Sequence, residues 1–151
     1  KAGRYMFEVK VIEFVNPQED NRRHSGPKQQ LRVGFATSSS SLFFGDGEES
    51  ACFDTSDGNY VTGKKKSGYL KKLAGANLHA RESVLAVLLN LEKGHANANT
   101  VSLFKDGVRI SQPQALPEGM VGKTLFPMVN FKNLSIFVNF GKEVLKPLPF
   151  K

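Results

Sequence analysis

Short apolar runs alternate along the whole chain with polar stretches that contain glycine, proline, asparagine or aspartate. Residues 4–15 place apolar side chains at every second position, a period of two that is typical of a half-buried β-strand. The apolar set is Tyr5, Phe7, Val9 and Val11, and the largely polar set between them is Met6, Glu8, Lys10 and Ile12. Residues 16–30 are polar apart from Pro17 and Pro27, which predicts a long loop.

Two further runs predict strands of different burial. Residues 31–35 alternate, and the set that shares the expected core face is Leu31, Val33 and Phe35. Arg32 and Gly34 then share the opposite face of that strand. Residues 84–91 are almost all apolar, which predicts a central strand that is buried on both faces.

Two tight turns are predicted in the C-terminal half of the chain. Asp106-Gly107 follows the apolar run that ends near residue 105, and this pair tolerates the positive φ angles of a type I′ hairpin turn. Lys132-Asn133 separates the strand-like runs 125–131 and 134–140. It predicts a second tight turn that joins the last pair of strands.

The middle of the chain predicts short strands without a long helix. Leu42, Phe43 and Phe44 are expected to cover the edge of the core, and apolar islands at 51–53 and 60–61 predict short strands. The whole chain then contains about nine or ten short strands, and antiparallel strands at this spacing form a sandwich or a barrel. A length of 151 residues suits one domain.

Basic residues are in excess and unevenly distributed. The chain has 21 lysines and arginines against 14 acidic residues, a net charge of +7. Such a balance attracts nucleic acid, anionic membranes or acidic peptides and does not choose among them. One dense lysine patch consists of Lys64, Lys65, Lys66, Lys71 and Lys72, and an acidic stretch precedes it. These segments predict either solvated loops or a bipolar surface that orients a charged partner.

The residues carry no pattern that is typical of catalysis or metal binding. His24, His79 and His95 are far apart, whereas metal sites usually pair ligands at short spacing. Residues 58–65 have the glycine spacing of a phosphate loop, but Lys65 stands where the magnesium-binding Ser or Thr belongs. We therefore predict no enzymatic activity, no cofactor and no metal.

The single cysteine, Cys52, cannot form an internal disulfide, which fits a reducing compartment. We predict that Cys52 is a small, buried hydrophobic residue. No apolar run is long enough to cross a membrane as a helix, and Glu8 and Lys10 interrupt the apolar start of the chain, unlike a signal peptide. We expect one domain over residues 1–151, excised from a longer intracellular protein that is nuclear or cytoplasmic.

Six short motifs in a fixed order resemble the SPRY domain family. They are Phe7-Glu8-Val9, Arg32-Val33-Gly34-Phe35, Cys52-Phe53-Asp54, Ser83-Val84-Leu85-Ala86, Phe104-Lys105-Asp106-Gly107, and Leu125-Phe126-Pro127 followed by Val138-Asn139-Phe140-Gly141. Each motif alone is weak, but six in order span essentially the whole chain. The chain departs from the family at Phe35, often a Trp there, and at Cys52, usually a Gly. Residues 42–66 look most like the nuclear ribonucleoprotein U type.

The resemblance implies an all-β fold, a bent antiparallel β-sandwich with a concanavalin-like or jelly-roll-like core. It also implies a non-catalytic module that binds a peptide or protein surface through loops at one side of the sandwich. In some relatives the arginine of the Arg-Val-Gly strand lines the binding pocket and meets acidic or phosphorylated residues, and that arginine corresponds to Arg32. The alternative is that Arg32 only pairs with a carboxylate inside the fold.

We therefore predict a monomeric interaction module that binds an acidic or phosphorylated peptide and scaffolds a larger complex. Nucleic-acid association through the lysine patch is an alternative, and a lectin-like glycan binder is a second one. The candidate partner-binding residues are Arg32, Gly34, Tyr60, Lys64, Lys65, Lys66 and Lys132.

Overall fold

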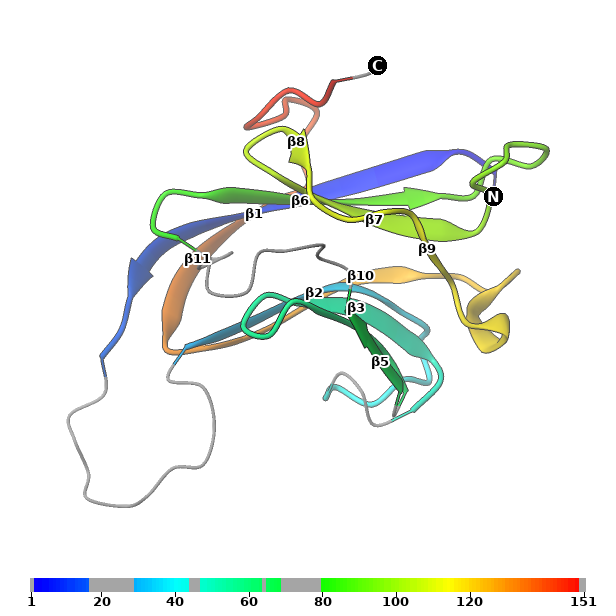
Figure 1. Ribbon diagram of the computed structural model, residues 1–151, viewed down its shortest axis with the longest axis horizontal. Helices are drawn as coiled ribbons and strands as arrows, with labels where there is room; N and C mark the ends of the chain where they lie inside the picture. Colours follow the sequence, from blue (N-terminus) through cyan, green and yellow to red (C-terminus); the bar gives the residue numbers. More distant parts are fainter. Residues whose placement is uncertain (1, 17–28, 44–46, 64, 69–79, 150–151) are drawn as a thin grey trace.

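Two antiparallel sheets lie face to face and enclose the core (Figure 1). The computed structural model describes residues 2–16, 29–43, 47–63, 65–68 and 80–149. Sheet A has the strand order β11-β1-β6-β7-β8, with β9 also paired to β7, and sheet B has the order β10-β2-β3-β4-β5. The strand spacing predicted an antiparallel sandwich or barrel and the family resemblance implied a sandwich; the structure is an all-β antiparallel sandwich.

The strands in sheet A are β1 (Arg4–Phe14), β6 (Val84–Asn90), β7 (Thr100–Lys105), β8 (Val108–Arg109), β9 (Gln114–Ala115) and β11 (Leu134–Asn139). Those in sheet B are β2 (Gln30–Ala36), β3 (Ser50–Asp54), β4 (Asn59–Thr62), β5 (Lys65–Gly68) and β10 (Phe126–Lys132). The described helical structure is one short 3-10 turn, η1 (Glu118–Met120). None of the described helices is long and apolar enough to cross a membrane.

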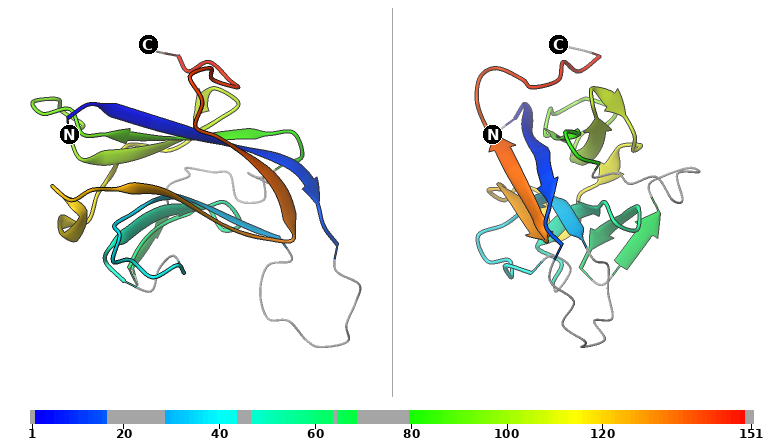
Figure 2. Two further views of the ribbon diagram at one scale, coloured as in Figure 1. Left: turned by 180° about the vertical axis from the view of Figure 1, so that it is seen from behind. Right: turned by 90° about the vertical axis from the view of Figure 1, so that its left-hand side faces the viewer.

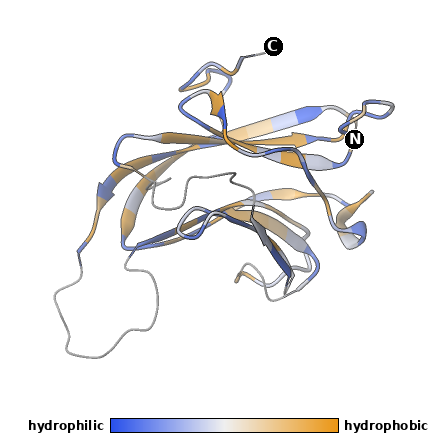
Figure 3. Cartoon of the chain, viewed as in Figure 1, coloured by the Kyte–Doolittle hydropathy of each residue, from blue (hydrophilic) through white to orange (hydrophobic). Residues whose placement is uncertain are grey.

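Alternating side chains from both sheets fill the space between the layers, and the apolar residues gather on these strands (Figure 3). Phe7 of sheet A meets Phe35 of sheet B edge to face, with ring centroids 5.5 Å apart. The predicted core face of β2 is confirmed, because Leu31, Val33 and Phe35 are all buried. Phe35 thus fills the core at the position where the family often has Trp.

The predicted central strand and its hairpin are confirmed. β6 pairs with β1 on one side and β7 on the other, and most of its residues are buried on both faces. Asp106 and Gly107 have φ angles of 49° and 84°, the positive values that a type I′ turn needs. The Asp106 carboxylate also accepts a hydrogen bond from the Val84 amide at 2.9 Å, which ties the turn to β6.

The second predicted turn is present, but the strands that it joins do not pair with each other. β10 pairs with β2 in sheet B, whereas β11 pairs with β1 in sheet A. Asn133, with a φ of 55°, makes the corner, and its carbonyl oxygen accepts a hydrogen bond from the Val15 amide at 3.0 Å. The chain therefore crosses from one layer to the other here, and β10 and β11 become edge strands on the same side (Figure 1).

One expectation about the core edge is wrong. Leu42 and Phe43 are 81% and 74% exposed, so they do not cover the core, and Phe44 lies outside the described residues. The segment instead runs beside β10, where the side-chain amide of Asn130 donates a hydrogen bond to the carbonyl oxygen of Leu42 at 3.0 Å. Because Asn130 is on the outer face of sheet B, this contact lies on the surface, away from the inter-sheet core.

The C-terminal segment lies over part of the outer face of sheet A (Figure 2). Its backbone amides at Leu145 and Lys146 donate hydrogen bonds to the Glu8 carboxylate at 2.7 and 3.0 Å. A Cβ atom on Gly107 would lie 2.6 Å from the carbonyl oxygen of Pro147, so the tail also touches the β7–β8 turn. Glu8 is consequently buried, although the period-two pattern had placed it on the largely polar face of a half-buried strand.

Candidate functional site

Arg32 lies on the outer face of sheet B, as the alternation along its strand predicts. The register of the sheet aligns Asn130 of β10, Arg32 of β2, Asp54 of β3 and Asn59 of β4 in one row. Facing residues in an antiparallel pair point to the same side of the sheet, so these polar side chains share one surface. Arg32 and Asp54 thereby come within direct contact.

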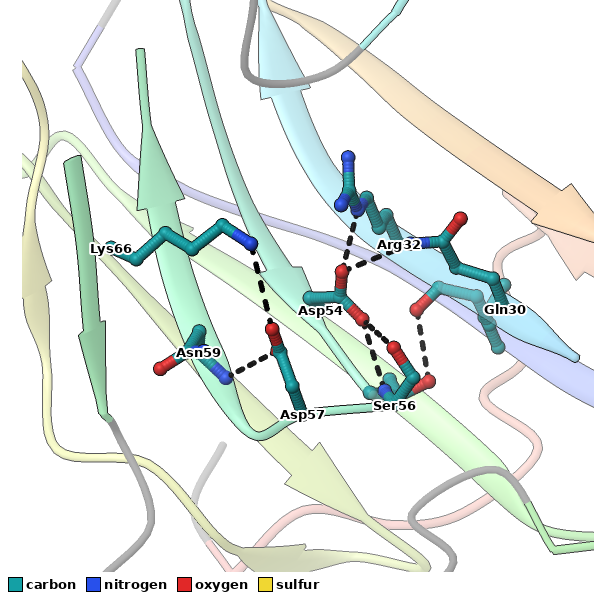
Figure 4. A network of polar contacts seen from close by, with 9 residues as sticks. Gln30, Arg32, Asp54, Ser56, Asp57, Asn59 and Lys66 are labelled. Atoms are coloured by element: carbon teal, nitrogen blue, oxygen red, sulfur yellow. Dashed lines mark hydrogen bonds and ion pairs between the residues drawn. The ribbon is translucent and has the colours of Figure 1, made fainter. Parts of the chain in front are cut away.

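Asp54 is the centre of a network of polar contacts (Figure 4). Its carboxylate is fully buried and accepts hydrogen bonds from Arg32 Nε at 2.6 Å, Gln30 Nε2 at 3.2 Å and the Ser56 amide at 3.0 Å. The Ser56 hydroxyl donates a further hydrogen bond to it. The carboxylate therefore fixes both the arginine on β2 and the loop that follows β3.

The surroundings of Asp54 keep its carboxyl group ionised. Burial acts to raise the pKa, but the hydrogen bonds from Ser56 and Arg32 outweigh burial and hold the pKa of Asp54 below its usual range. Arg32 keeps 22% of its side chain exposed, and its Nε points toward the Asp54 carboxylate (Figure 4). The buried carboxylate thus positions a permanent cation at the face of sheet B.

The two interpretations of Arg32 now have different standing. Its pairing with a carboxylate inside the fold is present in the structure. A role in binding a partner stays a prediction. The two are compatible, since Nε pairs with the carboxylate while 22% of the side chain stays exposed.

The lysine patch is only partly described. Lys65 and Lys66 are exposed in β5, the outer edge strand of sheet B, whereas Lys64, Lys71 and Lys72 lie outside the described residues. Lys66 Nζ is 3.7 Å from the carboxylate of Asp57, in the loop that continues from Asp54 (Figure 4). Nucleic-acid association through this patch therefore stays a prediction.

Lys132 lies on the same outer face as Arg32, at the opposite edge of sheet B from Lys66. It pairs in register with Gln30, which itself donates to Asp54. Lys132 is exposed and makes no ion pair with any residue of the described ranges. Phe131, just before it, is 54% exposed but pairs in register with Leu31, so its ring lies on the opposite side of the strand from Lys132.

Two of the candidate residues have internal roles. Tyr60 is 5% exposed, packs against Phe53 with ring centroids 5.2 Å apart, and donates a hydrogen bond to the Ala115 carbonyl oxygen at 2.9 Å. Gly34 is needed for packing, because a Cβ there would lie 2.6 Å from the Cα of Cys52. Neither offers a side chain to a partner, so we leave both out of the proposed surface.

Three residues of this network are absent from the candidates named from sequence: Asp54, which pairs with Arg32, and Gln30 and Ser56, which donate to Asp54. The aromatic-Asp motif at Cys52-Phe53-Asp54 was the available signal, since Asp directly after a core aromatic on a short strand must point to the outer face. The sequence could not assign its partner, because the pairing of β2 with β3 brings together residues 22 positions apart.

Metal binding and thiol chemistry gain no support from the described residues. No group of three or more His, Cys, Asp or Glu side chains among them could hold a metal ion. Cys52 is buried, and burial raises the pKa of its thiol to about 12, so the thiol stays protonated and unreactive near neutral pH. The prediction that Cys52 is a small buried hydrophobic residue is confirmed.

Among solved structures, the chain is similar to the SPRY domain of human HERC1, with a TM-score of 0.57 and 13% sequence identity. The match covers 95% of this chain and 78% of the HERC1 domain. No protein-family model matches the sequence, and the search of curated proteins finds no significant match. The similarity establishes a SPRY-like fold, whereas it does not support the ribonucleoprotein U type over other branches.

Proposed function

We propose that this domain is a non-catalytic interaction module and that the outer face of sheet B binds an acidic or phosphorylated peptide around Arg32. The observation that carries the proposal is the fixed position of Arg32, whose Nε is held 2.6 Å from a fully buried carboxylate. A cation that is already oriented loses little side-chain entropy when a partner binds. Such preorganisation favours recognition of one anionic group.

The neighbouring residues support this choice of partner. Lys132 and Lys66 lie on either side of Arg32 across sheet B, so an extended acidic segment that crosses the strands meets three cations. Planar guanidinium groups bind carboxylates and phosphates with two parallel hydrogen bonds. In the family that the sequence resembles, the arginine at this position meets acidic or phosphorylated residues in some members.

The proposal includes three features that come from sequence alone. We place the module in a larger intracellular protein, where it acts as a scaffold, and we expect the isolated domain to be monomeric. The branch of the family does not affect the proposed chemistry, so the ribonucleoprotein U type stays a separate prediction. Glycan binding gains no support from the row of Arg32 across sheet B, which consists of amide, guanidinium and carboxylate side chains.

The test is selection from a random peptide library that contains phosphoserine, with the isolated domain as bait. We expect enrichment of acidic or phosphorylated peptides, and we expect Arg32→Lys to weaken the selected peptide about tenfold because lysine cannot form the bidentate contact. Arg32→Lys keeps the positive charge beside Asp54, so it preserves the fold better than Arg32→Ala. Enrichment without acidic residues, or equal affinity in a folded Arg32→Lys variant, would refute the proposal.

Lys132→Gln and Lys10→Gln form a matched pair of controls. Both remove one positive charge, but Lys132 lies on the outer face of sheet B and Lys10 lies in sheet A, where it pairs with Glu82 at 2.7 Å. We expect Lys132→Gln to weaken the selected peptide and Lys10→Gln to leave it unchanged. Equal losses in both variants would indicate attraction by net charge alone.

A further inference from the structure

The space between the two sheets opens at the end of the sandwich where β1 starts, near the β6–β7 loop (Figure 1). A pocket of about 410 Å³ lies there, which we call the end pocket. Tyr5 of β1 and Leu89 of β6 line it and face each other in register in sheet A. Phe35 of β2 and Pro127 of β10 line it from sheet B, again as an in-register pair. Because Leu89 and Phe35 belong to the buried core, the end pocket leads into the apolar interior.

A second pocket of about 600 Å³ adjoins the end pocket and shares Leu91, Gly122 and Lys123 with it. Its walls come from the β6–β7 loop and from the segment that joins η1 to β10, and its lining includes the fully buried Met120. We call it the loop pocket. Both volumes fall within the usual range of ligand sites, roughly 300–1,000 Å³. Since the two pockets share lining residues, they form one continuous hollow, the end groove.

The end pocket offers apolar surface that stays open to water. Tyr5 is 42% exposed although it lies on the core face of β1, where Phe7 and Val9 are buried. Leu91 and Leu125 pack against the core but remain only half-buried. Burial of such surface by an apolar side chain of a ligand lowers the free energy in proportion to the area removed from water. The end pocket is therefore suited to one large apolar side chain.

The charged side chains that line the end groove are lysines. No acidic residue occurs among the described residues that line either pocket. Lys123 pairs with Glu49 at 3.3 Å, so its charge is partly offset. Lys93 lines the loop pocket, is exposed, and makes no ion pair with a described residue, while its neighbour Glu92 pairs with Arg4 at 2.8 Å. Electrostatic attraction therefore favours an acidic group in the loop pocket, near Lys93.

The segment between η1 and β10 also has unpaired backbone groups along the groove. Gly122, Thr124 and Leu125 line the end pocket and make no backbone hydrogen bond with a described residue. An extended peptide pairs its own N–H and C=O groups with such backbone, as it does at the edge of a sheet. A lipid acyl chain has no groups that could do so. This feature favours a peptide as the occupant.

We propose that the end groove binds an extended segment of a partner protein, with a large apolar side chain in the end pocket and an acidic side chain in the loop pocket. The site is separate from the surface proposed above, because Arg32 lies on the outer face of sheet B and does not line the groove. The two ligands also differ, since this one requires an apolar anchor. Either site can therefore fail without the other.

The experiment is a backbone amide NMR titration of the domain with short blocked peptides of serine and glycine that carry one phenylalanine, with one aspartate placed at each other position in turn. We expect the best of these peptides to give saturable shifts at residues 91, 93, 122, 124 and 125. Replacement of its phenylalanine by serine should weaken binding at least about tenfold, because the apolar anchor is lost. Replacement of its aspartate by asparagine should weaken binding about threefold, the effect of an exposed ion pair.

Two tryptophan substitutions test whether the peptide occupies the end pocket. Thr124 is exposed on the pocket wall, so Thr124→Trp adds a large ring there without disturbing the core. We expect it to weaken binding at least about tenfold, since the ring competes with the phenylalanine of the peptide for the same space. Val108→Trp is the matched control, because Val108 is exposed on β8 and does not line the groove. It should leave the affinity unchanged.

Two lysine substitutions test the loop pocket. Lys93→Gln should weaken the aspartate peptide about threefold but leave the asparagine peptide unchanged, because the ion pair exists in only one of the four combinations. Lys142→Gln is the control, since Lys142 is also exposed, makes no ion pair with a described residue, and lies outside the groove. It should affect neither peptide. Equal effects of the two variants would contradict the placement of the acidic side chain.

Other outcomes overturn the site as a whole. Shifts that do not saturate, or undiminished binding in a folded Thr124→Trp variant, would refute it. Shifts at the same residues that depend on protein concentration without peptide would assign the groove to a second copy of the chain. Tighter binding of octanoate than of any peptide would assign it to an acyl chain. A loss in Arg32→Lys as large as that in Thr124→Trp would place the peptide on the outer face of sheet B instead.

Discussion

Among the described residues, each sheet has one buried carboxylate on its outer side, and the two carboxylates have different donors. Glu8 in sheet A is 1% exposed and accepts hydrogen bonds from Asn139 Nδ2 at 2.8 Å and from the amides of Leu145 and Lys146. Asp54 in sheet B is 0% exposed and accepts from Arg32, together with neutral groups. The same functional group is therefore satisfied by neutral donors in one sheet and by a cation in the other.

The origin of the donors explains what each carboxylate does. The donors to Glu8 come from residues 131 to 138 positions later in the chain, so Glu8 fastens the C-terminal segment onto sheet A. Arg32 donates to Asp54 from the neighbouring strand, and 22% of its side chain is exposed. One carboxylate closes the fold, whereas the other orients a side chain that a partner can reach. The donors, and not burial alone, distinguish the two roles.

The largest expected effect in this comparison is that of Glu8→Ala. Removal of the carboxylate leaves two backbone amides and one side-chain amide without their acceptor, so we expect a loss of about 3 kcal/mol in the free energy of unfolding. Urea denaturation measures it. Glu13→Ala is the matched control, because Glu13 lies on the same strand, is exposed, and accepts one hydrogen bond from Ser135 at 3.1 Å. Equal costs for both variants would mean that Glu8 does not fasten the tail.

Asp54→Asn should have the next largest effect. The substitution keeps the shape of the side chain but removes the negative charge beside Arg32. The NH2 group of the asparagine then faces N–H donors and cannot accept their hydrogen bonds. We expect a loss of about 2 kcal/mol, less than for a fully buried ion pair because Arg32 is partly exposed. Asp57→Asn, in the exposed pair with Lys66 at 3.7 Å, should cost less than about 1 kcal/mol. Similar losses in the two variants would mean that the buried carboxylate of Asp54 contributes no more to stability than the exposed carboxylate of Asp57.

Much of the fold follows from local patterns in the sequence. The period of two places Leu31, Val33 and Phe35 in the core and Arg32 outside it, and the structure agrees. Asp106-Gly107 predicts its own hairpin, because the required φ angles depend on two neighbouring residues only. Local rules succeed here since each concerns residues within one strand or one turn.

The errors arise where burial depends on distant parts of the chain. Glu8 sits on a polar face by alternation, but the tail that buries it comes more than 130 residues later. Leu42 and Phe43 are apolar yet exposed. The hydrophobicity of a short segment does not determine whether the segment packs against the core. Lys132-Asn133 marks a turn correctly but not the change of sheet, because a turn sequence does not specify the partner of either strand.

The candidate site was predicted only in part, for the same reason. Alternation placed Arg32 on the surface of sheet B, and both structural and binding interpretations were left open. The alignment of Arg32 with Asp54 required the pairing of β2 and β3, which no single segment encodes. Tyr60 was named for the site but lies in the core, as its place in a short apolar run already allowed.

Acid should weaken the domain partly through Asp54. The folded state holds the pKa of Asp54 below the value of about 3.9 for an unperturbed Asp, so the unfolded state binds the proton more readily. The stabilisation is present above about pH 4 and is lost as the pH falls through the folded pKa. Denaturation at a series of pH values should give a flatter curve for Asp54→Asn than for the wild type. Parallel curves would exclude this contribution.

The smallest effect concerns the reactivity of Cys52, which lies one row from Asp54 on the outer face of sheet B. Its thiol is fully buried with a pKa raised to about 12, so a thiol reagent should label the native wild type only through transient opening. Asp54→Asn should be labelled faster than its global stability explains, because β3 is locally loosened. Glu8→Ala should be labelled only as fast as global unfolding allows, since Glu8 belongs to the other sheet. Labelling rates that follow global stability alone in both variants would show that the two sheets unfold as one cooperative unit. The two carboxylates would then differ in their relation to binding, but not in their effect on local stability.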